Sequence, residues 1–169
     1  ALPICAVASA GDVNGDGFGD IIVGAERYDN GETDEGRAFL YLGSVGGLAT
    51  APAWSDEGDQ ASAFYGEYVS TAGDVNGDGF ADIIVGSRFF ANGNHQEGAA
   101  FVYHGSTTGP SPDPSWTAEG GQDSAYFGRS VAGAGDLNAD GFSDVIIGAY
   151  GYGNGQSDEG RALVYSGSS

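Results

Sequence analysis

Residues 74–82 read DVNGDGFAD, and the same pattern, Asp-x-Asn-x-Asp-Gly-Phe-x-Asp, recurs at residues 12–20 and 136–144. The three copies are evenly spaced, since 74 − 12 = 62 and 136 − 74 = 62. Each copy places oxygen-bearing side chains at positions 1, 3, 5 and 9 and a glycine at position 6. A short loop wraps a hard cation such as Ca²⁺ in this way. The pattern therefore predicts a repeat protein in which each repeat carries its own ion.

The ligands expected in these loops are oxygen donors from side chains and one backbone carbonyl. The expected side-chain ligands are Asp12, Asn14, Asp16 and Asp20; Asp74, Asn76, Asp78 and Asp82; and Asp136, Asn138, Asp140 and Asp144. The carbonyls of Phe18, Phe80 and Phe142 fit position 7, and we expect their rings to turn into the blade. Mg²⁺ fits less well than Ca²⁺ because it keeps its own waters and demands octahedral geometry. We expect three Ca²⁺ sites per chain.

A twelve-residue EF-hand loop begins with the same letters and is the main competing interpretation of the motif. It needs a bidentate acid at position 12 and a helix after it. Position 12 is instead Val23, Val85 and Ile147 in the three copies, and β-forming residues surround it. The loop is therefore expected to close at position 9 and to return as a strand.

The middle repeat predicts four short strands, at residues 68–73, 82–87 and 99–105 and around residues 115–119. Val, Ile, Phe, Tyr and Trp fill these runs, while Gly, Pro, Asn and Asp fill the gaps between them. No segment keeps a period near 3.6, so essentially no helix is expected. Four antiparallel strands per repeat, arranged radially, make a β-propeller blade. A solenoid fits less well, because repeats of about 20–45 residues rarely carry four strands each.

The chain is expected to be a single partial propeller domain over residues 1–169. Its blades are assigned to residues 1–64, 65–126 and 127–169, and the last is expected to be incomplete after its third strand. Propellers close with about four to eight blades, and a three-blade arc would expose two apolar faces. We therefore expect either a piece of a longer propeller or self-association, in which two copies form a homodimeric ring of six blades.

Composition excludes several classes of protein. The formal net charge is −19, from 24 acidic residues against five arginines and no lysine, which repels nucleic acid and anionic lipid. Hydrophobic residues make up 40% and there are nine Phe, nine Tyr and two Trp, which is unlike a disordered chain. No apolar run is long enough to span a bilayer, so no membrane insertion is expected. Cys5 is the only cysteine, so an intrachain disulfide is excluded.

With these motifs the chain resembles the FG-GAP repeats of the integrin α-subunit β-propeller. Phe127-Gly128 and, as Tyr-Gly, Tyr65-Gly66 match the naming element, whereas the first unit has Pro3-Ile4 there. The second element is matched by Gly24-Ala25, Gly86-Ser87 and Gly148-Ala149, with the usual proline replaced by Glu26, Arg88 and Tyr150. The resemblance implies a propeller, usually seven-bladed, with calcium loops at one rim. It also implies a mainly structural role for the calcium and an extracellular or cell-surface location.

The predicted function is a non-catalytic, Ca²⁺-binding module for binding, adhesion or scaffolding. The chain has no Gly-x-Ser-x-Gly, no His-Glu-x-x-His and no Gly-rich phosphate loop, so we expect no enzyme activity. Glu35, Glu97 and Glu159 recur beside glycines, and we expect a turn role for them rather than the paired carboxylates of a hydrolase.

Two alternatives use other residues or missing sequence. In a lectin-like propeller, Trp54 and Trp116 would stack on sugar and Asn30, Asn92 and Asn154 would hydrogen-bond it. The competing interpretation is that the tryptophans pack an outer strand. The chain could also be an accessory domain of a larger extracellular enzyme whose chemistry lies elsewhere. A protein or a glycan ligand is compatible with the sequence.

Overall fold

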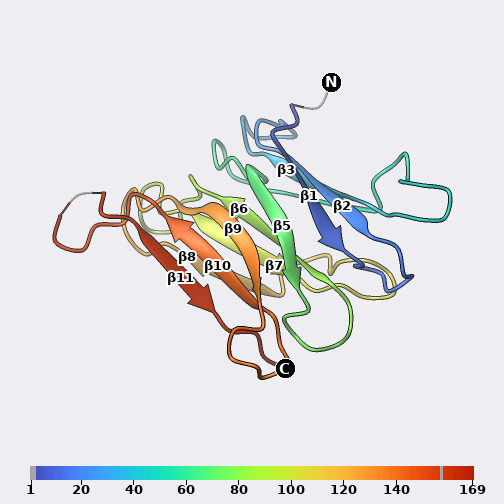
Figure 1. Cartoon of the computed structure of the whole chain (residues 1–169). Coiled ribbons are helices and arrows are strands. Elements are labelled where there is room, and N and C mark those ends of the chain that lie inside the picture. The colour runs from blue at the N-terminus through green and yellow to red at the C-terminus, as the bar shows by residue number, and fades with distance from the viewer. Residues whose placement is uncertain (1–2, 157) are drawn as a thin grey trace.

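The computed structural model describes residues 3–156 and 158–169, and the regular structure in this part of the chain is entirely β (Figure 1). Residues 1 and 2, which begin the first expected blade, lie outside the described residues. The strands are β1 (Ala6–Gly11), β2 (Asp20–Ala25), β3 (Arg37–Tyr41), β4 (Trp54–Glu57), β5 (Tyr68–Gly73), β6 (Asp82–Ser87), β7 (Ala99–Tyr103), β8 (Trp116–Glu119), β9 (Phe127–Gly135), β10 (Asp144–Ala149) and β11 (Arg161–Tyr165). The described part of the chain holds no helix with the length and apolar character needed to cross a bilayer.

The strands form three separate antiparallel sheets, each a simple meander. Their orders are β1-β2-β3-β4, β5-β6-β7-β8 and β9-β10-β11. The first two sheets share one register, with Leu40 opposite Trp54 and Val102 opposite Trp116. This confirms the predicted all-β class, with propeller blades of four, four and three strands in an arc that does not close.

Two hydrophobic clusters hold neighbouring sheets together. One joins the first and second sheets through buried side chains that include Ile22, Leu40 and Ile83. The other joins the second and third sheets through Ile84, Val102 and other apolar groups. Every residue of β6 is buried. A strand between two neighbouring blades has this character, which explains why its sequence, DIIVGS, is apolar at successive positions instead of alternating.

Glycine lets the backbones of neighbouring sheets approach closely. A Cβ atom added to Gly24 would lie 1.8 Å from the carbonyl oxygen of Gly66, and one added to Gly86 would lie 2.2 Å from that of Gly128. No side chain fits at these distances. The Gly-Ala and Gly-Ser elements of the sequence pattern are therefore contacts between blades.

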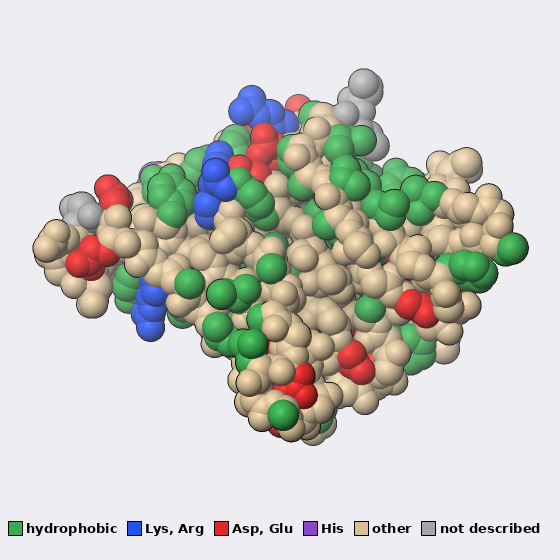
Figure 2. All heavy atoms as spheres, viewed as in Figure 1, with side chains coloured by type: hydrophobic (Ala, Val, Ile, Leu, Met, Phe, Trp, Pro, Cys, Tyr) green, Lys and Arg blue, Asp and Glu red, His purple; other side chains and the backbone are tan. Residues whose placement is uncertain are grey.

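The two ends of the arc expose apolar side chains whose counterparts elsewhere are buried. Val7 on β1 is 64% exposed, although its equivalent Val69 is 8% exposed. On the third sheet, Ile146 and Val164 are 38% and 51% exposed, although the equivalent Ile84 and Val102 are 0% and 2% exposed. Figure 2 shows hydrophobic side chains spread over the visible surface. Each end of the arc thus lacks the neighbour that covers the same positions in the middle sheet.

Candidate metal centres

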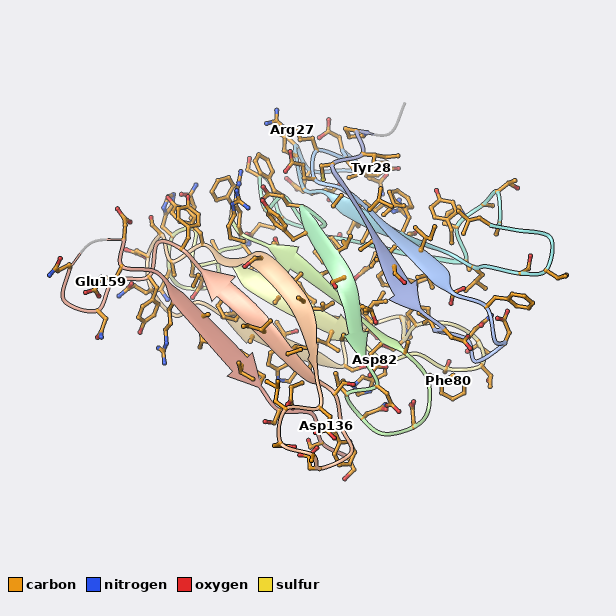
Figure 3. All side chains as sticks on the ribbon, in the orientation of Figure 1. Arg27, Tyr28, Phe80, Asp82, Asp136 and Glu159 are labelled. Atoms are coloured by element: carbon orange, nitrogen blue, oxygen red, sulfur yellow. The ribbon has the colours of Figure 1, made fainter. Side chains whose placement is uncertain are left out.

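The three Asp-rich loops all lie along one rim of the arc, each between the first and second strands of its sheet. Figure 3 labels Phe80, Asp82 and Asp136 at this rim. A shift in strand register precedes the first two loops, between Ser9 and Gly11 and between Thr71 and Gly73. This irregularity ends the regular pairing of the first strand, and the chain then enters the loop.

Positions 1, 3 and 5 of each loop are brought together by hydrogen bonds. In the middle loop, Asp74 Oδ1 accepts from the amide of Asp78 at 3.1 Å, and Asp74 Oδ2 accepts from the amide of Gly79 at 2.9 Å. Asn76 Nδ2 donates to Asp78 Oδ2 at 2.8 Å. The equivalent Asn–Asp bonds are 2.9 Å and 2.8 Å in the first and third loops. The backbone amides therefore fix the carboxylates of this half of the motif.

The aspartate at position 9 has a different environment. Asp82 is fully buried, and its two oxygens accept from the amides of Val75 and Gly105, both at 2.8 Å. Burial raises the pKa of Asp82, and these two hydrogen bonds act in the opposite direction. Asp20 and Asp144 make the equivalent pairs of bonds. The sequence did not reveal this second role, in which position 9 ties the loop to the residues that follow the third strand.

Among the described residues, no three Asp, Glu, His or Cys side chains converge tightly enough to hold a metal ion. The chemistry of the donors nevertheless fits a hard cation. Each loop carries three carboxylates, and none of the salt bridges found in the described part of the chain involves them. On the visible face, Figure 2 shows acidic side chains and no Lys or Arg along this rim. A carboxylate oxygen that accepts one hydrogen bond keeps lone-pair capacity for an ion.

The phenylalanines at position 7 correct one expectation. The rings of Phe80 and Phe142 do not turn into their own blade but lie on the preceding loop. A Cβ atom added to Gly15 would lie 2.6 Å from Phe80 Cε1, and one added to Gly77 would lie 2.6 Å from Phe142 Cε1. Phe18 has no preceding loop in this chain and is 41% exposed. The phenylalanine ring is thus packed only where a preceding blade is present. A motif within one repeat does not reveal this contact between repeats.

The recurring glutamates organise turns. Glu97 is buried and accepts from the amides of Asn92 at 2.8 Å and Gly121 at 3.1 Å, and from Asn94 Nδ2 at 3.0 Å. Burial alone would raise the pKa of Glu97, but hydrogen bonds, chiefly from Asn94 and Asn92, outweigh it, so the pKa is lowered. Glu35 and Glu159 accept from the amides of Asn30 and Asn154 in the same way. This supports the turn role over a hydrolase pair.

We expect Glu97→Ala to lower the free energy of unfolding by about 3–5 kcal/mol at pH 7, because it leaves several amides without an acceptor. Since the folded-state pKa is lowered, this stabilisation is complete above the unfolded pKa of about 4.3 and is lost as the pH falls through the folded value. Urea unfolding of wild type and variant should therefore differ most at pH 7, and the difference should shrink as the pH falls below the unfolded pKa. Glu32→Gln, at an exposed acid, is the control, and equal stability of Glu97→Ala and wild type at pH 7 would contradict the turn role.

The tryptophans and asparagines of the lectin alternative are engaged within the fold. Trp54 packs edge-on against Tyr103, with ring centroids 4.9 Å apart, and its Nε1 donates to the carbonyl of Ser111 at 3.1 Å. Asn30 Nδ2 donates to Glu57 at 2.9 Å, and Asn92 Nδ2 donates to Glu119 at 2.9 Å. These contacts support packing of the outer strand over sugar binding.

A buried polar cluster at the first junction between sheets was not predicted. The hydroxyls of Tyr65 and Tyr103 are 2.6 Å apart, and Tyr103 also donates to Asp56. Burial raises the pKa values of Tyr103 and Asp56. The equivalent residues at the second junction are Phe127, Tyr165 and Ala118, so two of the three positions are non-polar there. In the sequence, these positions are visible only as differences between equivalent residues of the repeats. Such differences do not show that the three side chains contact one another.

Comparison with known proteins agrees with this architecture. The FG-GAP repeat family model matches residues 6–41, 68–103 and 127–165. These ranges hold the first three strands and the Asp-rich loop of each sheet.

Several integrin α chains are similar to this chain. Integrin alpha-5 of Xenopus laevis is 32% identical over 170 residues, which cover 95% of this chain and 16% of that protein. Integrin alpha-PS2 of Drosophila melanogaster is 34% identical, covering 82% of this chain and 11% of that protein. Integrin alpha-IIb of Mus musculus is 35% identical, covering 83% and 14%. The chain thus corresponds to a small part of each of these relatives, and within that part it belongs to the FG-GAP repeat family of integrin α-type propellers.

Proposed function

We propose that this chain is a non-catalytic, Ca²⁺-stabilised β-propeller module that serves binding or adhesion at the cell surface or outside the cell. The observation that carries the proposal is the repetition of one oxygen donor set, without a basic partner, in three loops of an integrin-like FG-GAP arc. The proposed blades are residues 1–64, 65–126 and 127–169.

The proposed ligands in each loop are the aspartates at positions 1, 5 and 9, the asparagine at position 3 and the carbonyl at position 7. They are Asp12, Asn14, Asp16, Phe18 and Asp20; Asp74, Asn76, Asp78, Phe80 and Asp82; and Asp136, Asn138, Asp140, Phe142 and Asp144. When bound, Ca²⁺ supplies positive charge that offsets the repulsion among the carboxylates. Extracellular modules bind Ca²⁺ at about 10⁻⁴–10⁻³ M, which supports a location outside the cytosol.

The uncovered faces at the two ends of the arc support self-association into a homodimeric ring of six blades. At one end of the arc, Val7 and Phe18 are exposed where a preceding blade would cover them. At the other end, Ile146 and Val164 are exposed where a following blade would cover them. Two copies placed head to tail with two-fold symmetry would cover both faces twice and close the ring.

We expect light scattering in millimolar Ca²⁺ to give about twice the chain mass of 17.0 kDa. A concentration-independent mass near 17.0 kDa would contradict the homodimer and leave the arc to be completed by other sequence. That result would leave the proposed calcium loops untouched, because their effect on stability is measured separately.

One substitution makes the mass measurement sharper. The intrachain junctions place Phe80 on Gly15 and Phe142 on Gly77, but the third loop has Ala139 at the equivalent position. In the ring, Phe18 of the partner would meet that methyl group. Ala139→Gly should therefore tighten the dimer, measured as a lower dissociation constant, whereas Glu32→Gln should leave it unchanged. Weaker association of Ala139→Gly would show that the junction between copies does not follow the intrachain geometry.

A further inference from the structure

A cavity lies between β4 of the first sheet and β7 of the second sheet. Both of these sheets have all four strands, so the cavity is inside the arc and not at either of its ends. Its volume is about 220 Å³, below the roughly 300–1,000 Å³ of sites for drug-sized ligands. The lining includes the acids Asp56, Glu57, Asp59 and Asp113 and four aromatic rings. The cavity therefore suits a group about the size of a side chain.

The buried tyrosines in the lining offer hydrogen-bond acceptors and no free proton. Tyr65 is 2% exposed and Tyr103 is 0% exposed. Tyr103 gives its only hydroxyl proton to Asp56, so Tyr65 is the donor in the 2.6 Å contact between the two hydroxyls. Both protons are then used, and among the described residues no donor reaches the oxygen of Tyr65. A ligand in this cavity must therefore supply the hydrogen-bond donor.

The charged groups in the lining are all negative. Among the four acids, Glu57 alone takes part in a salt bridge in the described part of the chain, with Arg37 at 3.4 Å. The cavity thus favours a ligand that is both a donor and a cation.

Aromatic rings distinguish this cavity from a metal site. The ring centroid of Phe101 lies 5.5 Å from that of Tyr65 and 5.7 Å from that of Phe90. The face of such a ring attracts an ammonium group within about 6 Å of its centroid. A hard metal ion would instead need about six to eight oxygen ligands. Carboxylates together with ring faces favour an organic ammonium ion.

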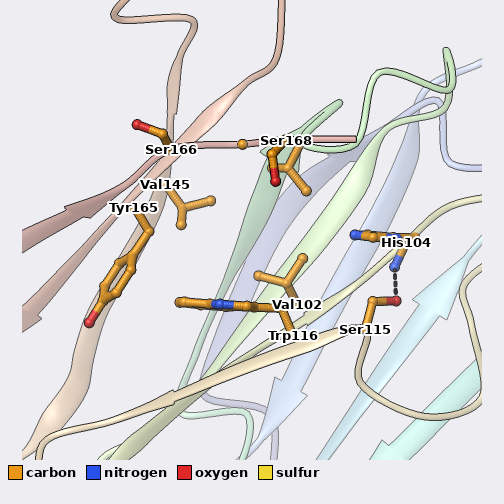
Figure 4. Close-up of a pocket in the computed structure, with 10 residues that line it drawn as sticks. Val102, His104, Ser115, Trp116, Val145, Tyr165, Ser166 and Ser168 are labelled. Atoms are coloured by element: carbon orange, nitrogen blue, oxygen red, sulfur yellow. Dashed lines mark hydrogen bonds between the residues drawn. The ribbon is translucent and has the colours of Figure 1, made fainter.

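The second junction shows that the fold does not need this polar group. Phe127 and Ala118 stand there at the positions of Tyr65 and Asp56. Tyr165, the equivalent of the second tyrosine, lines a cavity whose described lining residues include no acid (Figure 4). Well-packed apolar residues often stabilise a protein as much as a buried polar group does. Packing alone therefore does not account for the polar set at the first junction.

We propose that the cavity between β4 and β7 is a binding site for an alkylammonium group, carried by a free amine or by a lysine side chain of another polypeptide. Its N–H groups donate to the Tyr65 oxygen and the Asp56 carboxylate, and its alkyl part packs against Phe101. Asp59 and Asp113 are exposed parts of the lining and attract the cation from solvent. The site uses neither the proposed calcium loops nor the ring.

The first test is an NMR titration of the full chain with butylammonium chloride in millimolar Ca²⁺. We expect saturable shift changes at Tyr65, Phe101 and Tyr103, with a Kd on the order of 1 mM. n-Butanol, an uncharged ligand of similar shape, should bind at least about tenfold more weakly, because charge-assisted hydrogen bonds are lost. The proposal would be overturned by no saturation up to about 50 mM, by equal affinity for the two ligands, or by shift changes confined to the Asp-rich loops.

Variants assign the binding to this cavity. Asp56→Asn keeps the shape of the side chain and should weaken butylammonium binding about tenfold. Glu32→Gln removes a charge at an exposed acid elsewhere and should bind like wild type. Tyr65→Phe combined with Asp56→Ala reproduces the residues of the second junction, so this variant should fold and lose saturable binding. Wild-type affinity in Asp56→Asn or in the double variant would contradict the proposal.

A lysine peptide distinguishes the two sources of the ammonium group. The probe is acetyl-Gly-Lys-Gly-amide, titrated into wild type and into Asp56→Asn. The same shift changes as with butylammonium, weakened in the variant, would assign the site to a side chain of a partner polypeptide. Binding of butylammonium without binding of the peptide would assign the site to a free amine.

Discussion

Chelation of Ca²⁺ is expected to lower the melting temperature of this chain by roughly 15–30 °C. A ligand that binds only the folded state at about 100 times its Kd adds about 2.7 kcal/mol per site, so three sites add about 8 kcal/mol. For a chain of this size, 1 kcal/mol corresponds to about 2–4 °C. The physical cause is that bound Ca²⁺ would supply positive charge to the carboxylates at positions 1, 5 and 9 in the folded state and not in the unfolded chain. Thermal unfolding followed by circular dichroism, in millimolar Ca²⁺ and in chelator, measures the effect.

Single substitutions assign the effect to the loops. Asp16→Asn, Asp78→Asn and Asp140→Asn each remove one charge while keeping an oxygen acceptor. Each should reduce the difference between Ca²⁺ and chelator by about one third. Glu32→Gln removes a charge outside the loops and should keep the full difference. The structural role of calcium would be refuted by a melting temperature that is the same with and without chelator. Mg²⁺ at the same concentration should protect less, because it keeps its own waters.

Gly86→Ala should have the second large effect, a loss of more than about 4 kcal/mol in the free energy of unfolding. The new methyl group would lie 2.2 Å from the carbonyl oxygen of Gly128 and 3.3 Å from Val131 Cγ1. A backbone carbonyl cannot rotate away as a side chain does, so the second and third sheets must separate. Separation uncovers the cluster around Ile84 and Val102. Urea unfolding followed by tryptophan fluorescence measures the loss.

Gly148→Ala is the matched control for this prediction. Gly148 is the equivalent residue of the third sheet, and its nearest obstacle is Ser130 Oγ at 2.4 Å. That hydroxyl can change rotamer, so we expect a loss of about 1 kcal/mol or less. Equal losses for the two variants would show that the cost arises within each strand and not from the approach of two blades.

The strands were predictable because the same sequence pattern occurs in all three repeats. The ranges 68–73 and 82–87 agree with β5 and β6 at both ends, and the fourth strand lies within the expected residues 115–119. The third strand is shorter than expected and ends at Tyr103. Period, turn residues and β-branched runs are local signals, and they fix elements whose hydrogen bonds lie within one repeat.

Contacts between repeats were less predictable. A spacing of 62 residues shows which positions are equivalent, but it does not show what each one touches. Phe80 was expected to face its own blade, yet its ring lies on Gly15 of the preceding loop. Asp82 was expected only as a ligand, yet both of its oxygens hold backbone amides. Whether the fifteen proposed ligands bind Ca²⁺ stays a prediction, which the chelation experiment decides.

The placement of the phenylalanine rings predicts that Ca²⁺ binding at the proposed sites is cooperative. Phe80 lies on the first loop and Phe142 lies on the second. When an ion orders one loop, that loop therefore gives the neighbouring loop a better-ordered surface to pack against. Sites linked in this way share a coupling free energy, and the linkage is reciprocal. The middle loop touches both others and is therefore the point through which the outer two communicate. The three loops would then bind Ca²⁺ cooperatively, in one transition, rather than as three independent sites.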